Sequence, residues 1–466
     1  MSFFKAYDMR GTFGVDFDLD TVYKVGRALP QVVKGKKWLV GRDCRTTSKD
    51  VRDALVKGLA ESGAEVSDLG LCTTPMVYYF TAADGFDGSV MITASHNPPS
   101  DNGLKVSMKT ALPVGYANGL NEVERLVAAD SGRADGEVVV ESDSGRAEFR
   151  DRYIEFLKKL TSTAPLRLSA ATDLKIGIDC SNGMSSLLVH ELFPNAVVIN
   201  DTLDGTFPNH SPNPLKAEAR EQLAALVREK HLDCGIIFDG DADRAMFVDE
   251  NGEFVQPDYL IPLVASSTAA VNSNTQTPKH PNTFKIIHDV RTSRGAIETL
   301  REWGFEPVMV PVGHAFAKPI LRKVGALCGG ELAGHYYFSE FFGCDSGILA
   351  ALRVLSEFAR YRSSSSTSTF SSMMKPIVSR YANSGEINFK VEDKDAAIER
   401  VLAVAAAKLP RELSRSTMDG IRIEYEEGWI NIHKSNTEPF LRLIVECKTK
   451  PMLDTWVKLL GKAIES

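Results

Sequence analysis

Residues 49–63 read KDVRDALVKGLAESG, and a short apolar run lies on either side of them, Trp38–Val40 before and Val90–Ile92 after. Within this stretch the apolar residues have the spacing of one face of a helix, at Val51, Leu55, Val56 and Leu59. Gly63 follows as a helix stop. The pattern predicts a strand, a helix and a second strand, which is the βαβ unit of α/β proteins.

The same order occurs twice more along the chain. The second block predicts a strand, a helix and a returning strand at residues 175–179, 218–230 and 235–238. The third predicts them at residues 284–287, 294–303 and 308–310. Three βαβ-bearing segments in succession indicate an α/β fold with mixed or parallel sheets.

The chain is too long for one hydrophobic core, since it has 466 residues. A stretch rich in serine and threonine, residues 363–372, has the composition of an exposed connector. Beyond it, strands near 385–391, 421–423 and 441–445 and a helix over 395–408 predict a small α+β domain. We therefore expect four domains, 1–150, 151–257, 258–372 and 373–466.

Composition excludes several functional classes. The formal net charge of −7 gives no general attraction to nucleic acid or to an anionic membrane surface. The chain has no apolar run long enough to span a bilayer, and its first residues lack the pattern of a secretion signal. The seven cysteines are scattered and form no Cys-x-x-Cys pair, so we expect reduced thiols and a cytoplasmic protein.

A serine lies where the strand Val90–Ile92 ends, in the stretch Thr93–Pro98 (TASHNP). The prolines that follow disfavour a helix, which places Ser95 in a loop at the carboxyl end of a strand. Ligands of open α/β sheets gather at that edge. The alternative is a capped turn in which Ser95 and Asn97 satisfy backbone groups.

Three carboxylates follow another strand, in Asp239–Arg244 (DGDADR). Such close carboxylates repel unless a cation binds, and hard oxygen ligands suit Mg²⁺. An EF-hand needs glycine at the sixth position, where Arg244 stands, and helices at both ends, where residues 235–238 and 245–248 predict strands. A solvated acidic hairpin turn is the other alternative. A hydroxyl and a metal loop together suggest metal-assisted phosphoryl transfer through a phosphoserine.

The sequence resembles the α-D-phosphohexomutase family, in particular its phosphomannomutase/phosphoglucomutase branch. Five motifs stand in the family's order, at Phe4–Gly11, Thr93–Pro98, Asp239–Arg244, Gly330–His335 and Ser435–Pro439. The resemblance implies four domains around a central cleft, the first three alike. The four domains would bear, in order, the phosphoserine, the metal, the sugar-recognition loop and the phosphate-binding loop.

The resemblance also implies roles for individual residues. Ser95 would carry the phosphoryl group and bind Mg²⁺ together with Asp239, Asp241 and Asp243. The other catalytic residues would be Lys105, Arg10 and His96. A lysine base needs a lowered pKa, and surface salt bridges are the alternative for Lys105 and Arg10. The substrate-binding residues would be Tyr7, Arg244, Arg291, His314, Glu331, His335, His433, Ser435, Asn436 and Thr437.

The implied reaction interconverts a hexose 1-phosphate and its 6-phosphate, with mannose and/or glucose as the sugar. Glucose or mannose 1,6-bisphosphate would be the intermediate and activator. The bisphosphate has to turn over before it returns its other phosphate to Ser95, and a mobile fourth domain would close over it. The implied partner is a phosphosugar, with no nucleic acid and no membrane.

Two positions depart from the family pattern. Ala333 stands where the sugar loop usually has serine, and His433 stands where the phosphate loop usually has arginine. A histidine with a pKa of about 6.5 would lose its charge between about pH 6 and 8, so we expect phosphate binding to weaken over that range relative to an arginine variant.

Three other functions remain open. Asn436 favours the phosphomannomutase/phosphoglucomutase branch over phosphoglucosamine mutase, which typically has glycine there. A serine phosphohydrolase and a catalytically silent phosphosugar-binding protein are the alternatives outside the mutases. The phosphohydrolase would release free phosphate steadily, which a mutase would not.

Overall fold

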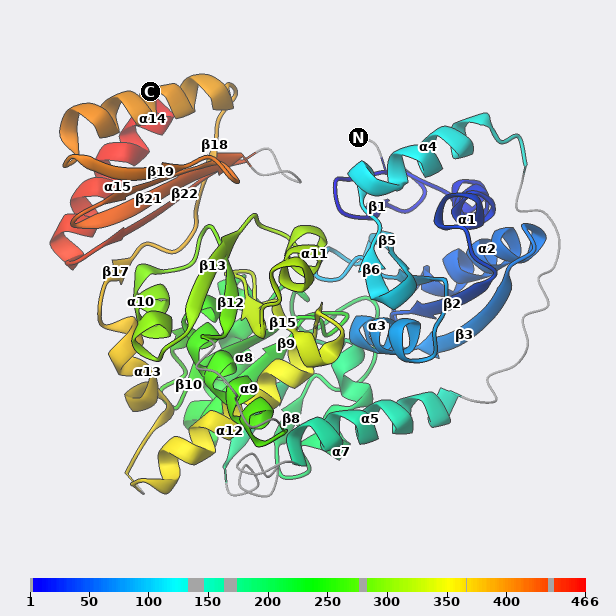
Figure 1. Cartoon of the computed structure of the whole chain (residues 1–466), viewed down its shortest axis with the longest axis horizontal. Helices are drawn as coiled ribbons and strands as arrows, with labels where there is room; N and C mark the ends of the chain where they lie inside the picture. The colour runs from blue at the N-terminus through cyan, green and yellow to red at the C-terminus, as the bar shows by residue number, and fades with distance from the viewer. Residues whose placement is uncertain (1–2, 133–145, 163–173, 276–282, 366, 435–439) are drawn as a thin grey trace.

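The computed structural model of the chain describes residues 3–132, 146–162, 174–275, 283–365, 367–434 and 440–466. The described residues form four sheets, which follow one another along the chain. In Figure 1 the first domain, in blue to cyan, and the fourth, in orange to red, lie on opposite sides of the second and third.

The first domain has a mixed sheet in the order β1-β5-β4-β2-β3, with β6 paired to β5. Its strands are β1 (Met9–Thr12), β2 (Lys37–Arg42), β3 (Glu65–Leu71), β4 (Gly88–Ile92), β5 (Asp101–Met108) and β6 (Leu112–Pro113). Its helices are α1 (Leu19–Val33), α2 (Ser48–Glu61), α3 (Thr74–Ala83) and α4 (Leu120–Ala129), and α5 (Arg146–Ser162) leads into the second domain. Strands β3, β2 and β4 run parallel, and β5 is antiparallel to β4.

The second sheet has the order β11-β10-β9-β7-β8. Its strands are β7 (Ile176–Asp179), β8 (Val197–Ile199), β9 (Cys234–Phe238), β10 (Ala245–Asp249) and β11 (Phe254–Val255), and its helices are α7 (Val189–Leu192) and α8 (Ala217–Lys230).

The third sheet has the order β13-β12-β14-β15-β16. Its strands are β12 (Lys285–Asp289), β13 (Glu306–Val310), β14 (Cys328–Gly330), β15 (Tyr336–Phe338) and β16 (Cys344–Asp345). Its helices are α9 (Ile261–Thr275), α10 (Arg294–Glu302), α11 (His314–Val324), α12 (Gly347–Ser363) and α13 (Phe370–Val378).

All three sheets repeat one arrangement. Three parallel strands, with the first along the chain in the middle, are followed by a strand that returns antiparallel. The returning strand is β5 in the first sheet, β10 in the second and β15 in the third. A largely continuous hydrophobic core joins the three domains, and the buried helix α12 lies within it.

The fourth domain is an antiparallel sheet covered by two helices. Its strands are β17 (Ala382–Asn383), β18 (Ile387–Lys390), β19 (Glu412–Ser416), β20 (Ile421–Tyr425), β21 (Gly428–Lys434) and β22 (Phe440–Cys447). The helices are α14 (Lys394–Lys408) and α15 (Lys450–Glu465). Short 3₁₀ helices elsewhere are η1 (Lys109–Ala111), η2 (Tyr116–Asn118), η3 (Met184–Leu187), η4 (Pro257–Leu260) and η5 (Ser339–Phe341).

The α/β fold with a smaller last domain is confirmed, and the three βαβ units lie where the apolar pattern predicts them. Gly63, at a φ of +81°, follows the end of α2. The seven cysteines form no disulfide. No described helix combines the length and the apolar character that crossing a membrane would require.

The serine-rich stretch is exposed at residues 363–365 and 367, as its composition predicts, but its two ends belong to helices. Its first residue ends α12, and its last three begin α13. Thr369 and Ser372 form a reciprocal capping box at the start of that helix, and Phe370 is buried in the core. The boundary expected near 372 therefore falls inside a packed helix, and the passage to the fourth domain comes after Val378.

Candidate active site

Three of the sequence motifs occupy one topological position. In each of the first three sheets, a loop joins the parallel edge of the sheet to the returning antiparallel strand. The serine loop joins β4 to β5, the aspartate loop joins β9 to β10, and the loop with Glu331 and His335 joins β14 to β15. Contacts between them show that the three loops meet in space.

Ser95 lies against the aspartate loop. Its hydroxyl donates a hydrogen bond to Asp239 Oδ2 over 2.7 Å, across the boundary between the first two domains. The residue is buried, and its φ of +51° is left-handed, a conformation that side chains rarely adopt. Its amide donates to Thr93 Oγ1, which helps to hold this turn. The backbone thus aims a serine hydroxyl at a carboxylate.

The carboxylates of Asp239, Asp241 and Asp243 form a buried cluster. A ligand oxygen from each lies within 4.8 Å of the others. Burial and the two neighbouring carboxylates hold the pKa of Asp239 well above its ordinary value. Oδ1 of Asp241 and Oδ1 of Asp243 are buried and make no hydrogen bond within the described part of the chain. Unsatisfied, converging carboxylate oxygens fit a divalent cation with hard ligand preference.

This geometry decides between the alternatives for the aspartate loop. Antiparallel strands flank the loop, which excludes the helix–loop–helix of an EF-hand. The loop is a hairpin turn, but its three carboxylates are fully buried, so it is not a solvated one.

Lys105, on β5, bridges two members of the cluster. Its Nζ lies 2.6 Å from Asp241 Oδ2 and 2.6 Å from Asp243 Oδ2. Burial alone would lower the pKa of Lys105, but the two carboxylates raise it above its ordinary value. A lysine base needs the opposite shift, so in this arrangement Lys105 is a fixed positive charge. It is also buried, which excludes a surface salt bridge.

Two further predicted catalytic residues lie beside Ser95. Arg10, on β1, donates to Asp8 over 2.6 Å and to Asn97 Oδ1 over 3.1 Å. His96 has its Nδ1 3.3 Å from Ser95 Oγ. Burial and then the positive charge of Arg244 lower the pKa of His96 well below its ordinary value. His96 is therefore a neutral imidazole at the serine.

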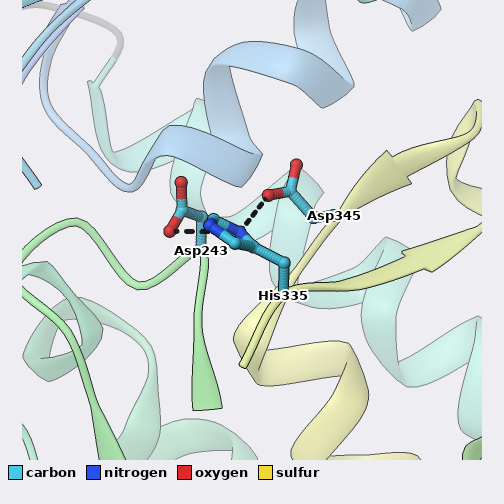
Figure 2. A group of neighbouring side chains, drawn as sticks. All are labelled: Asp243, His335 and Asp345. Atoms are coloured by element: carbon cyan, nitrogen blue, oxygen red, sulfur yellow. Dashed lines mark hydrogen bonds and ion pairs between the residues drawn. The ribbon is translucent and has the colours of Figure 1, made fainter. Parts of the chain in front are cut away.

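His335 lies between carboxylates of two domains. Figure 2 shows its imidazole between Asp243 and Asp345, with Nδ1 2.7 Å from Asp345 Oδ2 and 3.8 Å from Asp243 Oδ1. Arg244 donates from Nε to His335 Nε2 over 3.0 Å. Lys318 Nζ lies 2.8 Å from Asp345 Oδ1. Since both ring nitrogens and Asp345 already have partners, we do not assign a second metal to these residues.

The remaining predicted sugar-binding residues lie around this histidine. Glu331 accepts from the hydroxyl of Tyr337 over 2.6 Å, and burial raises its pKa. The ring of His314 lies between those of His335 and Tyr7, with centroids 6.1 and 6.4 Å away. Tyr7 lines a largely apolar cavity of about 580 Å³.

Side-chain nitrogens from the third and fourth domains gather around Glu386. Its carboxylate lies 3.4 Å from Arg291 Nη1, 3.2 Å from Arg442 Nη1 and 3.8 Å from His433 Nε2. Arg291 also holds Asp289, at 2.6 Å. The predicted residues Ser435, Asn436 and Thr437 lie outside the described part of the chain.

His433 does not have the pKa that we expected. Burial, with the charges of Arg291 and Arg442, lowers its pKa to about 3. The imidazole is therefore neutral from pH 6 to 8, and the expected loss of charge over that range is wrong for this structure. Arg442, directly opposite His433 in the β21–β22 ladder, remains as a positive group at this position.

Sequence reasoning missed several residues that organise the site. Thr74 donates to Asp241, and Arg45 contacts the serine loop. Asp345 holds His335 and is itself paired with Lys318. One signal was available for Arg45, because Asp43-x-Arg45 and Asp289-x-Arg291 stand at the carboxyl ends of equivalent strands, β2 and β12.

A serine hydroxyl lies against a buried carboxylate cluster where the repeated sheets meet. This arrangement defines an α/β enzyme with a carboxylate centre of the metal-binding type. Four domain models of one family match the chain in order. They are phosphoglucomutase/phosphomannomutase alpha/beta/alpha domains I, II and III, over residues 1–133, 151–252 and 256–379, and the C-terminal domain, over residues 386–459.

Known proteins are similar over nearly the whole chain. A phosphomannomutase from Salmonella montevideo is 34% identical over 478 residues, covering 99% of each chain. A protein described as "Phosphohexose mutases" from Xanthomonas campestris pv. campestris is 36% identical, over 96% of this chain and 95% of its own. A crystal structure of a phosphoglucomutase/phosphomannomutase family protein from Burkholderia thailandensis has a TM-score of 0.80 and 27% identity, covering 99% of this chain and 97% of its own.

The chain belongs to the phosphoglucomutase/phosphomannomutase family. It is an isomerase that acts on phosphosugars as a mutase, in a family that depends on a metal.

Proposed function

We propose that this enzyme moves a phosphoryl group reversibly between C1 and C6 of a hexose phosphate, with Ser95 as the phosphoryl carrier. The observation that carries the proposal is the 2.7 Å contact between Ser95 Oγ and Asp239 inside a buried carboxylate cluster. A serine oxygen needs an organising charge to carry phosphate, and this cluster is built to hold one.

Mg²⁺ is the proposed metal, with Ser95, Asp239, Asp241 and Asp243 as its ligands. When bound, it would neutralise charge on the transferring phosphoryl group. Lys105 adds a positive charge at Asp241 and Asp243, and Arg244 lies 3.7 Å from Asp239. Arg10 donates to Asn97 in the serine loop. The neutral His96 is placed to form a hydrogen bond with Ser95 Oγ.

In the forward reaction the Ser95 Oγ–phosphorus bond breaks as a bond forms between phosphorus and the free sugar hydroxyl oxygen. The sugar hydroxyl loses its proton and the departing Ser95 oxygen gains one, so the proton count is unchanged. The product is a hexose 1,6-bisphosphate, which turns over and returns its other phosphate to Ser95. Added glucose or mannose 1,6-bisphosphate would load an unphosphorylated enzyme. The four domains would bear the serine, the metal, the sugar-recognition loop and the phosphate-binding loop.

The third and fourth domains supply groups for recognition. We propose Glu331, His335 and His314 as partners of the sugar, and Arg442, Arg291 and residues 435–437 as partners of the non-reacting phosphate. Mannose and glucose phosphates are the proposed substrates, as the names of the relatives favour phosphomannomutase activity. Unpaired thiols at all seven cysteines are consistent with the cytoplasm as the proposed location.

Ser95→Ala tests the proposal. Turnover of glucose 1-phosphate and mannose 1-phosphate, with Mg²⁺ and a trace of 1,6-bisphosphate, should fall by orders of magnitude while the fold persists. Intact-mass measurement should show a phosphate adduct on the wild type that the variant lacks. Ser89→Ala is the matched control, because it removes another buried hydroxyl from the strand that leads to Ser95.

The same assay separates the alternatives. Steady release of free phosphate from the sugar phosphate would favour a phosphohydrolase, and binding without turnover would favour a silent phosphosugar-binding protein. Faster turnover of glucosamine 1-phosphate than of either hexose phosphate would favour phosphoglucosamine mutase. Near-normal mutase turnover by Ser95→Ala would exclude Ser95 as the carrier.

A further inference from the structure

Arg45 holds the serine loop through both of its terminal nitrogens. It follows β2, is 2% exposed, and pairs through Nε with Asp43 Oδ2 over 3.1 Å. Its two terminal nitrogens donate to four main-chain carbonyls at 2.6 to 2.9 Å, those of Ser95, Asn97, Pro98 and Asp101. A guanidinium has five N–H groups in a fixed plane, and here each has an acceptor.

Arg45 holds a part of the loop whose backbone conformation is unfavourable. Ser95 is left-handed, which is unfavourable for a residue with a Cβ. Its carbonyl is turned toward the aspartate loop, where a side chain at Gly240 would place its Cβ 2.6 Å from Ser95 O. The Arg45 Nη2 contact at 2.8 Å supports this carbonyl where it faces Gly240. The carbonyl contact and the hydroxyl contact to Asp239 therefore depend on the same backbone turn.

The second domain covers this arginine. The ring of Phe207 lies over the guanidinium, with its centroid 5.0 Å from Cζ. Gly205 packs so closely that an added Cβ would lie 2.4 Å from Arg45 Cα. The guanidinium thus lies between the serine loop and a wall from the domain that bears the carboxylates.

The corresponding arginine of the third domain is used differently. Asp43 and Asp289 each accept the backbone N–H of the residue two positions on, Arg45 and Arg291. Arg291, however, extends to Glu386 of the fourth domain, at 3.4 Å. Among the described residues, Arg291 reaches the equivalent loop only through an ion pair with Glu331 at 4.0 Å. The hold on four loop carbonyls is therefore a particular feature of the domain with Ser95.

We propose that Arg45, covered by Phe207, is a positioning residue that holds Ser95 Oγ in line with the carboxylate cluster for phosphoryl transfer. This inference rests on the proposed role of Ser95 as phosphoryl carrier. Arg45 acts through the loop backbone and touches neither the sugar nor its phosphates. Its loss should therefore lower the rate of transfer and leave substrate binding nearly unchanged.

Arg45→Lys keeps the charge but cannot reach four carbonyls from one nitrogen. We expect its kcat, and its rate of Ser95 phosphorylation by glucose 1,6-bisphosphate, to fall about 100-fold, as for a misplaced reacting group, with KM close to the wild-type value. Arg52→Lys is the matched control. Arg52 is also buried in the first domain but pairs with Asp53 and Asp68, so its kcat should stay near wild type.

Methylguanidinium added to Arg45→Ala supplies a further readout. Partial recovery of the phosphorylation rate, without recovery in Ser95→Ala, supports the positioning role. If Arg45→Lys does not fold by circular dichroism, Phe207→Leu takes its place. That variant should load phosphate about 2- to 5-fold more slowly, the size of one cation–π contact.

The outcomes separate this inference from the function on which it rests. A wild-type enzyme that never acquires phosphate on Ser95 contradicts the proposed function. Wild-type phosphorylation together with equally fast loading of folded Arg45→Lys, or of Phe207→Leu where that variant is used, overturns the positioning role. A raised KM with an unchanged kcat also overturns it, because Arg45 would then act on substrate binding.

Discussion

Asp239→Asn removes one charge from the carboxylate cluster and should have opposite effects on stability with and without a metal. In chelator, two unit charges 4.8 Å apart repel by about 3.5 kcal/mol at an effective dielectric of 20. Arg244, whose Nε lies 3.7 Å from Asp239, and partial protonation of the cluster reduce this repulsion. We therefore expect the variant to be more stable than the wild type in chelator, by about 1–2 kcal/mol.

The pH dependence has a definite sign. The pKa of Asp239 is raised in the folded protein. Its protonation therefore stabilises the fold, and this contribution is complete below about pH 3.9, the pKa of the unfolded chain. The contribution is lost as the pH rises through the raised pKa. Asparagine does not titrate, so the Asp239→Asn variant does not lose this stability as the pH rises. The advantage of the variant in chelator should thus grow from pH 4 toward pH 8.

Mg²⁺ should reverse the order. A metal at 100 times its dissociation constant stabilises the wild type by about 2.7 kcal/mol, and a variant that binds it more weakly gains less. Thermal unfolding in chelator and in Mg²⁺ measures both effects without any assay of activity. Asp249→Asn is the control, because Asp249 is buried in the same sheet but caps the turn after β10, so its loss should destabilise the protein in both buffers. An equal rise in Tm on adding Mg²⁺ to wild type and Asp239→Asn would refute the reasoning.

Three other changes test neighbouring parts of the site. Asp241→Asn should weaken Mg²⁺ binding, and excess Mg²⁺ should partly restore turnover; full wild-type activity in strong chelator would contradict the metal site. Ala333→Ser, at a half-buried position of the sugar loop, should change KM or the mannose-to-glucose ratio by an amount worth about 1 kcal/mol, and identical kinetics for both sugars would show that this hydroxyl makes no contact. His433→Arg should give a ratio of wild-type to variant KM that stays flat from pH 6 to 8, because the pKa of His433 is about 3, whereas a ratio that grows with pH would show that the histidine is charged when substrate binds.

Local patterns predicted the secondary structure because they record burial within one element. The apolar face of α2 and the short apolar runs of β2 and β4 are features of neighbouring residues, so one sequence reveals them. The loops with Ser95 and Asp239 were also placed at strand ends. The boundary near residue 372 was misjudged because the serine-rich composition resembles a linker, while capping and the buried Phe370 place the end of the stretch in α13.

Contacts between distant residues were beyond the reach of sequence patterns. The charge on Lys105 depends on carboxylates 136 and 138 positions away, which raise its pKa. The low pKa of His433 comes from burial beside arginines of two domains. Arg45 lies 50 positions before Ser95, and no periodicity joins them. A pKa or a positioning contact is set by tertiary packing, which the residue types alone do not specify.

The repeated position of the three loops has a consequence for how such an enzyme can diversify. Each loop is anchored at both ends by a strand of its own sheet, so the length and composition of one can change without altering the register of the other two. In the proposed function, the loop between β14 and β15 would determine the choice of sugar, and the serine and aspartate loops would carry out the phosphoryl transfer. Under the proposed sugar contacts of Glu331 and His335, exchange of residues 331–335 between family members would be a compact route to a new substrate preference. The main-chain hydrogen bond from Ala245 to Gly334, which joins this segment to the aspartate loop, would have to be kept.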